Sequence, residues 1–146
     1  MSTIKQKMSG WGRYPVHETF VARPEKNTEL TNLLNNESIP NWITYGLGRS
    51  YGDTPLNENG GTILTTSLNH FLSFDETTGV LECEAGVSFK EILDVFVPRG
   101  YFLPVTPGTK FVTVGGAIAN DVHGKNHHVD GTFSQHVLDF TLLLAS

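Results

Sequence analysis

The chain has 146 residues, enough for one domain or for two small lobes that share a core. Its formal charge is -5 and 17% of its residues are charged, so no basic face is expected and nucleic acid is a poor candidate partner. The single cysteine excludes an internal disulfide and a cysteine-based zinc ribbon. No apolar run approaches the roughly 20 residues of a membrane span, and residues 1–15 lack the apolar segment of a secretory signal, which predicts a cytoplasmic protein.

Strands and helices are predicted in mixed order along the first half of the chain. Residues 1–15 hold too much Gly and Pro for a helix and are expected to form an irregular arm. A helix is predicted over residues 24–36, because leucines recur there at helical spacing. Residues 42–45 and 62–66 are rich in β-branched and aromatic side chains, which predicts two strands.

A hairpin and a capped helix are predicted next. Residues 71–74 and 80–85 alternate in polarity around a turn, which is typical of an antiparallel hairpin. Ser88 is followed three residues later by Glu91, the pattern of a capping box at the start of a helix. Pro98 ends that helix, because proline cannot continue it.

The last third of the chain is predicted to hold one more helix and one more strand. We expect the helix to begin near Thr113 with two glycines in its first turn, since Gly-Gly opposes the alternative of a strand interior. Residues 137–144 are apolar and β-prone and predict a strand. A buried strand is normally followed by a turn and another element, so we expect this chain to be a fragment of a longer protein.

Two glycine-rich segments could hold an anion on main-chain N–H groups. Residues 46–52 follow a predicted strand, and glycines there allow the positive φ and close approach of an anion nest, to which Arg49 could add a contact. Their spacing matches neither the Rossmann fingerprint nor the Walker pattern, and the glycines alone slightly favour the alternative of a tight turn without a ligand. The second segment is the expected helix start near Gly115 and Gly116, where unpaired N–H groups would form a second anion site; a small-residue helix packed on a sheet is the alternative.

A histidine-rich segment has three interpretations. Zinc ligation fits the spacing, but no cysteine is nearby and no metal is predicted. A polar loop without a chemical task is the second interpretation. In the third, the segment covers a reaction centre, where His123 and Lys125 polarise a bound ring or substrate. The histidines concerned are His123, His127, His128 and His136.

Residues 46–53 (GLGRSYGD) and 114–128 (VGGAIANDVHGKNHH) resemble motifs of the FAD-linked oxidases of the vanillyl-alcohol oxidase / p-cresol methylhydroxylase fold. Residues 9–13 and 107–109 are similar too, so the resemblance spans nearly the whole chain. The HGKNHH string is typical of the branch of decaprenylphosphoryl-β-D-ribose oxidases, the flavin subunits of an arabinose epimerase. The glycine motifs belong to the whole superfamily.

The resemblance implies an α+β fold, the FAD-binding domain of the p-cresol methylhydroxylase type, made of two α/β lobes with the cofactor between them. Residues 1–67 would be the first lobe with its N-terminal arm. Residues 68–146 would be the second lobe, incomplete here, and a substrate domain would be absent.

The resemblance also implies site residues. Tyr51, His123 and Lys125 would face the flavin–substrate region as candidate catalytic residues, while the main base would lie outside this chain. Arg49 stands where relatives with covalently attached flavin carry histidine, so non-covalent FAD is expected. The residues implied to bind the cofactor are Tyr45, Gly46, Leu47, Gly48, Arg49, Ser50, Tyr51, Gly52, Gly108, Thr113, Gly115, Gly116, Ala117, Asn120 and His123.

The implied function is the N-terminal FAD-binding portion of a flavin-dependent oxidoreductase that oxidises a secondary alcohol of a polyprenylphosphoryl-ribose-like sugar to a ketone. The sugar would bind through the missing C-terminal domain, a short-chain reductase would be a further partner, and this chain alone is expected to be inactive. The alternatives are an alditol or aldonolactone oxidase of the same fold, and a flavin-free fragment that self-associates through exposed sheet edges.

Overall fold

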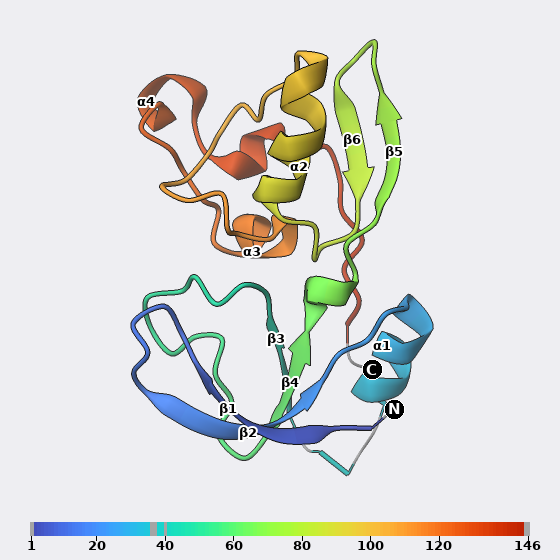
Figure 1. Ribbon diagram of the computed structural model, residues 1–146, viewed down its shortest axis with the longest axis vertical. Helices are drawn as coiled ribbons and strands as arrows, with labels where there is room; N and C mark the ends of the chain where they lie inside the picture. Colours follow the sequence, from blue (N-terminus) through green and yellow to red (C-terminus); the bar gives the residue numbers. More distant parts are fainter. Residues whose placement is uncertain (1, 36–37, 40, 145–146) are drawn as a thin grey trace. The chain divides into compact units, whose positions relative to one another are not determined.

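The computed structural model describes residues 2–35, 38–39 and 41–144 (Figure 1). Contacts divide the chain into two compact units, one of Met1–Leu68 with Leu142–Ser146 and one of Asn69–Thr141. Each unit has its own sheet and its own buried core, and each is described separately below. The assignment of residues 1–67 and 68–146 to two cofactor-binding lobes stays a prediction.

The first unit is built on a four-stranded sheet of order β1-β2-β4-β3. The strands are β1 (Ile4–Ser9), β2 (Val16–Ala22), β3 (Trp42–Tyr45) and β4 (Gly61–Leu64). β4 pairs in parallel with both β2 and β3, whereas β1 and β2 are antiparallel. Of the two predicted strands, 42–45 is confirmed, and the second ends at Leu64 because Thr65–Ser67 forms a 3₁₀ turn.

The prediction of an irregular arm over residues 1–15 was wrong for Ile4–Ser9. The Gly and Pro residues that suggested irregular structure are confined to positions 10–15, which connect β1 to β2. The strand itself alternates apolar and polar residues weakly. Its register is fixed by six residue pairs with β2 and by an ion pair between Lys5 and Glu18 at 2.6 Å.

Helix α1 (Asn27–Leu34) packs on this sheet through Leu33, which is buried against Ala22 and Ile63. The helix is shorter than predicted, because Lys26 is its N-cap and Pro24 lies before its first turn. Its predicted end at residue 36 lies outside the described residues. A second core cluster of the unit joins β1, β2 and β4 through Met8, Val21 and Leu64, with Tyr45 packed against it.

The second unit opens with the predicted hairpin of β5 (Phe71–Asp75) and β6 (Val80–Cys83). Gly79 takes a φ of 74° in its turn, a backbone conformation that favours glycine. Helix α2 (Phe89–Phe96) carries the predicted capping box. The Ser88 side chain accepts the N–H of Glu91, and the Glu91 carboxylate accepts the N–H of Ser88 at 2.8 Å.

The core of the second unit gathers side chains from α2, from the loop around Val105 and from α3 (Val114–Ala119). Val87, Phe89, Val105 and Ala117 are fully buried in it. The helix predicted near Thr113 is confirmed, with Thr113 as its N-cap. The remaining short elements are 3₁₀ turns at Val97–Arg99 and Phe133–His136 and a short helix α4 (His127–Asp130).

The predicted strand over residues 137–144 is not formed in the structure. A strand needs a neighbour to complete its hydrogen-bond ladder, and no described residue pairs with this segment in a sheet. Five apolar side chains along it are exposed: Leu138, Phe140, Leu142, Leu143 and Leu144. Among the described residues there is no helix of the length and apolarity that would cross a membrane.

Candidate functional site

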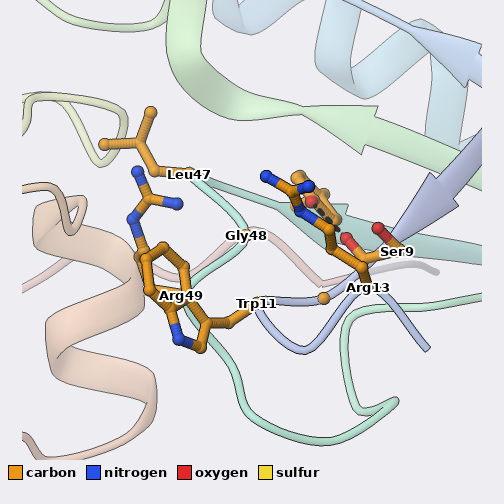
Figure 2. Close-up of a pocket in the computed structure, with 8 residues that line it drawn as sticks. Ser9, Trp11, Arg13, Leu47, Gly48 and Arg49 are labelled. Atoms are coloured by element: carbon orange, nitrogen blue, oxygen red, sulfur yellow. Dashed lines mark hydrogen bonds between the residues drawn. The ribbon is translucent and has the colours of Figure 1, made fainter. Parts of the chain in front are cut away.

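A pocket of about 270 Å³ lies in the first unit, at the end of β1 and of β3 (Figure 2). Two segments form it. One is the arm, defined here as residues 9–13, and the other is the glycine loop, defined as residues 46–52, together with Tyr45. The lining residues are Ser9, Gly10, Trp11, Arg13, Tyr45, Leu47, Gly48 and Arg49.

Gly48 gives the glycine loop its shape. Its φ of 65° lies in the left-handed region, and a Cβ at this position would overlap the phenol group of Tyr45. Within the described residues, the main-chain N–H groups of Gly48, Ser50, Tyr51 and Gly52 donate no hydrogen bond to the protein. Of the glycines at 46, 48 and 52, which were expected to allow a positive φ, only Gly48 adopts one. A left-handed residue beside unbonded N–H groups is a feature of anion nests, and the anion site itself stays a prediction.

The arm lies directly against the glycine loop. The N–H of Trp11 donates to the oxygen of Ser50 at 2.9 Å, and the hydroxyl of Tyr45 donates to the oxygen of Ser9 at 2.7 Å. Sequence reasoning identified the loop but missed these arm residues as part of the site. The available signal was the similarity of residues 9–13 to the FAD-linked oxidases, which was noted without giving these residues a role in the site.

The pocket is electropositive. Its described lining residues include Arg13 and Arg49 and no carboxylate. The Arg49 guanidinium lies over the Trp11 ring, 4.9 Å from its centroid. Burial raises the pKa of the Tyr45 hydroxyl, and the nearby Arg49 charge opposes part of that shift. Tyr45 is therefore a neutral hydrogen-bond donor at physiological pH, and the charges that can meet an anion belong to the two arginines.

The second predicted anion site, at the start of α3, was wrong in its physical argument. We expected unpaired N–H groups there, but those of Val114, Gly115 and Gly116 all donate hydrogen bonds within the protein. Val114 donates to the oxygen of Val87 at 2.8 Å, and Gly115 donates to the oxygen of Ala85 at 2.8 Å. Gly116 donates to the Thr113 hydroxyl at 3.1 Å.

Close packing accounts for Gly115. A Cβ added there would come within 3.0 Å of the Ala85 side chain and 3.2 Å of its carbonyl oxygen. The alternative of a small-residue helix in tight contact is therefore the better description of this segment, although its partner is the loop before α2 and not a sheet. Ala117, which the family resemblance placed at the cofactor, is fully buried in the core of the second unit.

The histidine-rich segment is an ordered turn around α4. Asn126 holds it by donating to the oxygen of Pro104 at 3.0 Å and to the carboxylate of Asp130 at 2.7 Å. The rings of His123 and His127 lie 5.2 Å apart, and Nε2 of His136 lies 2.9 Å from the oxygen of Asp130. In the part of the chain that the structure describes, no three His, Cys, Asp or Glu side chains are placed to share a metal ion.

The structure thus brings one group of the predicted site residues together, namely Tyr45, Leu47, Gly48 and Arg49 around the pocket. Tyr51, in the same loop, is 86% exposed and does not line it. Gly46, Ser50 and Gly52 belong to the same loop and are not among the lining residues. The remaining predicted residues belong to the second unit, where Gly108, Asn120, His123 and Lys125 are exposed. Their part in binding stays a prediction.

Comparison with known proteins shows the class of this chain. Residues 19–146 match the family model described as an FAD binding domain, and the chain belongs to this family. The resemblance stated from residues 46–53 and 114–128 is therefore confirmed.

Two curated proteins are similar in sequence to most of this chain. The chain is 40% identical over 99% of its length to a decaprenylphosphoryl-β-D-ribose oxidase of Mycolicibacterium smegmatis, and 34% identical over 88% of its length to a D-lactate dehydrogenase of Archaeoglobus fulgidus. It covers 32% and 30% of these two proteins, so it spans about a third of the relatives it matches.

Solved structures confirm the fold. A cholesterol oxidase from Brevibacterium sterolicum superposes with a TM-score of 0.72 at 17% identity, over 84% of this chain and 25% of that one. An alkyldihydroxyacetonephosphate synthase superposes with a TM-score of 0.70 at 18% identity, over 84% of this chain and 24% of that one. The predicted α+β FAD-binding fold is thus the observed one.

Proposed function

We propose that this chain is the FAD-binding part of a flavin-dependent oxidoreductase, and that its glycine loop holds the pyrophosphate of the cofactor. The observation that carries the proposal is the pocket of the first unit, where a left-handed Gly48 and unbonded main-chain N–H groups lie beside two arginines. Such a site binds a diphosphate with few charged side chains, which suits a chain of net charge -5.

The residues present fit this part of FAD. A volume of about 270 Å³ lies just below the roughly 300–1,000 Å³ of small-molecule pockets and suits the diphosphate rather than the whole dinucleotide. N–H groups of the glycine loop would donate to phosphate oxygens, and Arg49 would add a charge-assisted hydrogen bond. Once bound, FAD supplies the oxidant for a carbon–hydrogen bond of the substrate, while the protein orients the reactants.

In the second unit, the proposal gives binding roles to residues whose side chains are accessible. His123 and Lys125 are exposed and would face the reacting groups as proton donors or as charge partners, and Asn120 would contact the flavin. Tyr51 is assigned to the same region from the glycine loop, because its exposed phenol is free to meet a substrate. Gly115 and Gly116 are assigned a contact through their Cα surface only, since their N–H groups are already bonded.

We propose that the whole protein oxidises a secondary alcohol of a polyprenylphosphoryl-ribose-like sugar to a ketone. Support comes from the 40% identity to an oxidase named for such a substrate, over nearly the full chain. An alditol or aldonolactone oxidase is the alternative, and relatives named D-lactate dehydrogenase extend the range to hydroxy acids. Turnover of these three substrate classes by the complete protein distinguishes the proposals.

The binding proposal is tested by titrating the purified chain with FAD and following flavin fluorescence. Saturable quenching supports it, and no binding at millimolar FAD contradicts it. Arg49 replaces the histidine to which relatives attach flavin, so acid precipitation should leave all flavin in the supernatant. Yellow colour that stays in the washed precipitate would show a covalent link and contradict that part of the proposal.

A flavin-free fragment that self-associates is the second candidate. The specific observation in its favour is the exposed apolar segment with Leu138, Phe140 and Leu142, together with the open edges of the two-stranded β5–β6 sheet. Light scattering separates the candidates. A colourless oligomer that ignores FAD supports self-association, and a monomer that binds FAD supports the cofactor domain.

A further inference from the structure

We propose that the arm is one wall of the pyrophosphate site, and that Trp11 is a positioning residue that holds the Arg49 guanidinium ready for a phosphate oxygen. The inference rests on the proposed function, because it assigns further residues to the same FAD site.

Two hydrogen bonds hold the arm against the glycine loop and the preceding Tyr45, one between main-chain atoms and one from the Tyr45 hydroxyl. Trp11 donates its N–H to Ser50 at 2.9 Å, and Tyr45 reaches from the end of β3 to the oxygen of Ser9 at 2.7 Å. Both bonds occupy carbonyl oxygens and none occupies an N–H of the glycine loop. The arm therefore holds the loop through a carbonyl oxygen of the loop, that of Ser50. The N–H groups of Gly48 and Ser50 are left to bind a ligand.

The closeness of the two segments requires glycine in the arm. A Cβ at Gly10 would lie 2.8 Å from the oxygen of Ser50 and 2.8 Å from the oxygen of Gly52, closer than van der Waals contact allows. Both atoms are main-chain atoms of the glycine loop, so a side chain at position 10 would move the loop itself. The contact between the arm and the loop therefore depends on glycine at position 10.

Trp11 and Arg49 then meet across the two segments (Figure 2). The guanidinium carbon lies 4.9 Å from the centroid of the indole ring, within the range of attraction between a cation and an aromatic face. A long flexible side chain loses rotamer freedom when it binds a ligand, and an indole that already restricts it removes part of that loss. We infer that Trp11 strengthens anion binding without touching the anion.

Arg13 supports the same arrangement. Its N–H donates to the oxygen of Gly10 at 3.1 Å, which closes a tight turn, and its φ of 59° is a left-handed conformation that is uncommon outside glycine. The turn places a second guanidinium-bearing residue on the pocket wall. Uncommon backbone conformations of this kind persist where the surroundings hold them and concentrate at ligand sites.

The test measures the FAD dissociation constant of the 146-residue chain by fluorescence, for the wild type and for Trp11→Ala, Trp11→Phe and Ile4→Ala. Ile4 is an exposed apolar residue on the same β1–β2 hairpin, outside the pocket, and serves as the matched control. Trp11→Ala should weaken binding about three- to tenfold, the size of a partly exposed cation–aromatic contact. Trp11→Phe should restore most of the loss, and Ile4→Ala should leave binding unchanged.

A second background distinguishes positioning from a general structural role. If Trp11 acts through the guanidinium, Trp11→Ala should weaken binding by less than about twofold in a chain that already carries Arg49→Gln. ADP, which keeps the diphosphate and lacks the flavin, should show the same ratios as FAD. Equal losses in both backgrounds, or a loss for FAD without one for ADP, would overturn the inference.

The outcomes separate this inference from the proposed function. A wild-type chain that binds FAD, with Trp11→Ala binding equally well, contradicts the positioning role and leaves the proposed function in place. A wild-type chain that binds neither FAD nor ADP contradicts the proposed function and the inference with it.

Discussion

The hydroxyl of Tyr45, at the end of β3, donates a hydrogen bond of 2.7 Å to the main-chain oxygen of Ser9, at the end of β1. These strands are the two outer strands of the sheet, so the bond joins one edge strand to the other. The same phenol group packs against Gly48. One side chain thus connects the arm, the sheet and the glycine loop.

Replacing Tyr45 with phenylalanine should destabilise the first unit by about 1 kcal/mol, because a partly buried carbonyl loses its donor. Both tryptophans, Trp11 and Trp42, lie in the first unit, so urea unfolding followed by tryptophan fluorescence reports on that unit. Tyr14→Phe removes the hydroxyl of a tyrosine that is 83% exposed and is the control. Equal midpoints for the two variants would show that the bond contributes nothing.

Gly48 and Gly52 should respond differently to the same substitution. Gly48→Ala places a Cβ on the Tyr45 phenol in a left-handed conformation, which costs about 1–2 kcal/mol before any repacking. Nothing lies within 4 Å of a Cβ at Gly52, so Gly52→Ala should unfold at the wild-type urea concentration. A Gly48→Ala chain as stable as Gly52→Ala would contradict the described loop geometry.

Patterns between residues close in sequence predicted the β5–β6 hairpin and the helices α1 and α2. The capping box is the clearest case, because Ser88 and Glu91 satisfy each other's main-chain groups with no help from distant residues. β1 was missed for the opposite reason. Its residues form a strand by pairing with β2 across the turn. The glycines and the proline of that turn led to the prediction that all of residues 1–15 are irregular.

The site residues were predictable where the local backbone conformation decides their role, and not where hydrogen-bond partners from elsewhere in the fold decide it. Left-handed Gly48 follows from glycine in a loop after a strand. The glycines at 115 and 116 carry the same letters, but their N–H groups are bonded to Ala85 and Thr113, which only the tertiary structure reveals. Residues 137–144 have strand composition, yet a strand forms only where a partner supplies the ladder.

The Ser88–Glu91 capping box predicts an acid-sensitive helix. Burial alone would raise the pKa of Glu91, but hydrogen bonds from the side chain and main chain of Ser88, with help from Asn69, outweigh it and lower that pKa below 4.5. A lowered folded-state pKa contributes stability that is present above pH 4.5 and lost as the pH falls through the folded value.

Amide hydrogen exchange of α2 should therefore quicken as the pH falls below about 4.5, after correction for the intrinsic rate. In Glu91→Gln this pH dependence should disappear. Ser88→Ala should also lose about 1 kcal/mol at neutral pH, because the cap is removed. Retention of the acid sensitivity in Glu91→Gln would assign it to another carboxylate.

Gly115→Ala should destabilise the second unit more than Gly116→Ala. Both changes gain roughly 1 kcal/mol of helix propensity, so the difference between them isolates local packing. At position 115 the new methyl group meets Ala85 at 3.0 Å, whereas at position 116 it meets only the Thr113 hydroxyl at 3.0 Å. We expect a difference of about 1 kcal/mol or more in thermal unfolding. Equal stability would show that the Ala85 contact relaxes freely.

Cys83 should be an unreactive thiol in the folded chain. Burial, followed by the negative charges of Glu82 and Glu84, raises its pKa from 9.0 to about 11. Alkylation by iodoacetamide requires the thiolate, so the rate in the folded chain should rise with a midpoint near pH 11, and in the denaturant-unfolded chain near pH 9.

The raised pKa of Cys83 makes the free energy of unfolding depend on pH in the alkaline range. A raised folded-state pKa contributes stability that is complete below pH 9 and lost as the pH rises through about 11, because the unfolded chain releases its proton first. The difference in unfolding free energy between wild type and Cys83→Ala should therefore shrink over this range. Tyrosines and lysines titrate in both chains and cancel in the comparison. A folded-chain alkylation midpoint near pH 9 would mean that water and the solvated thiolate reach Cys83 in the native hairpin.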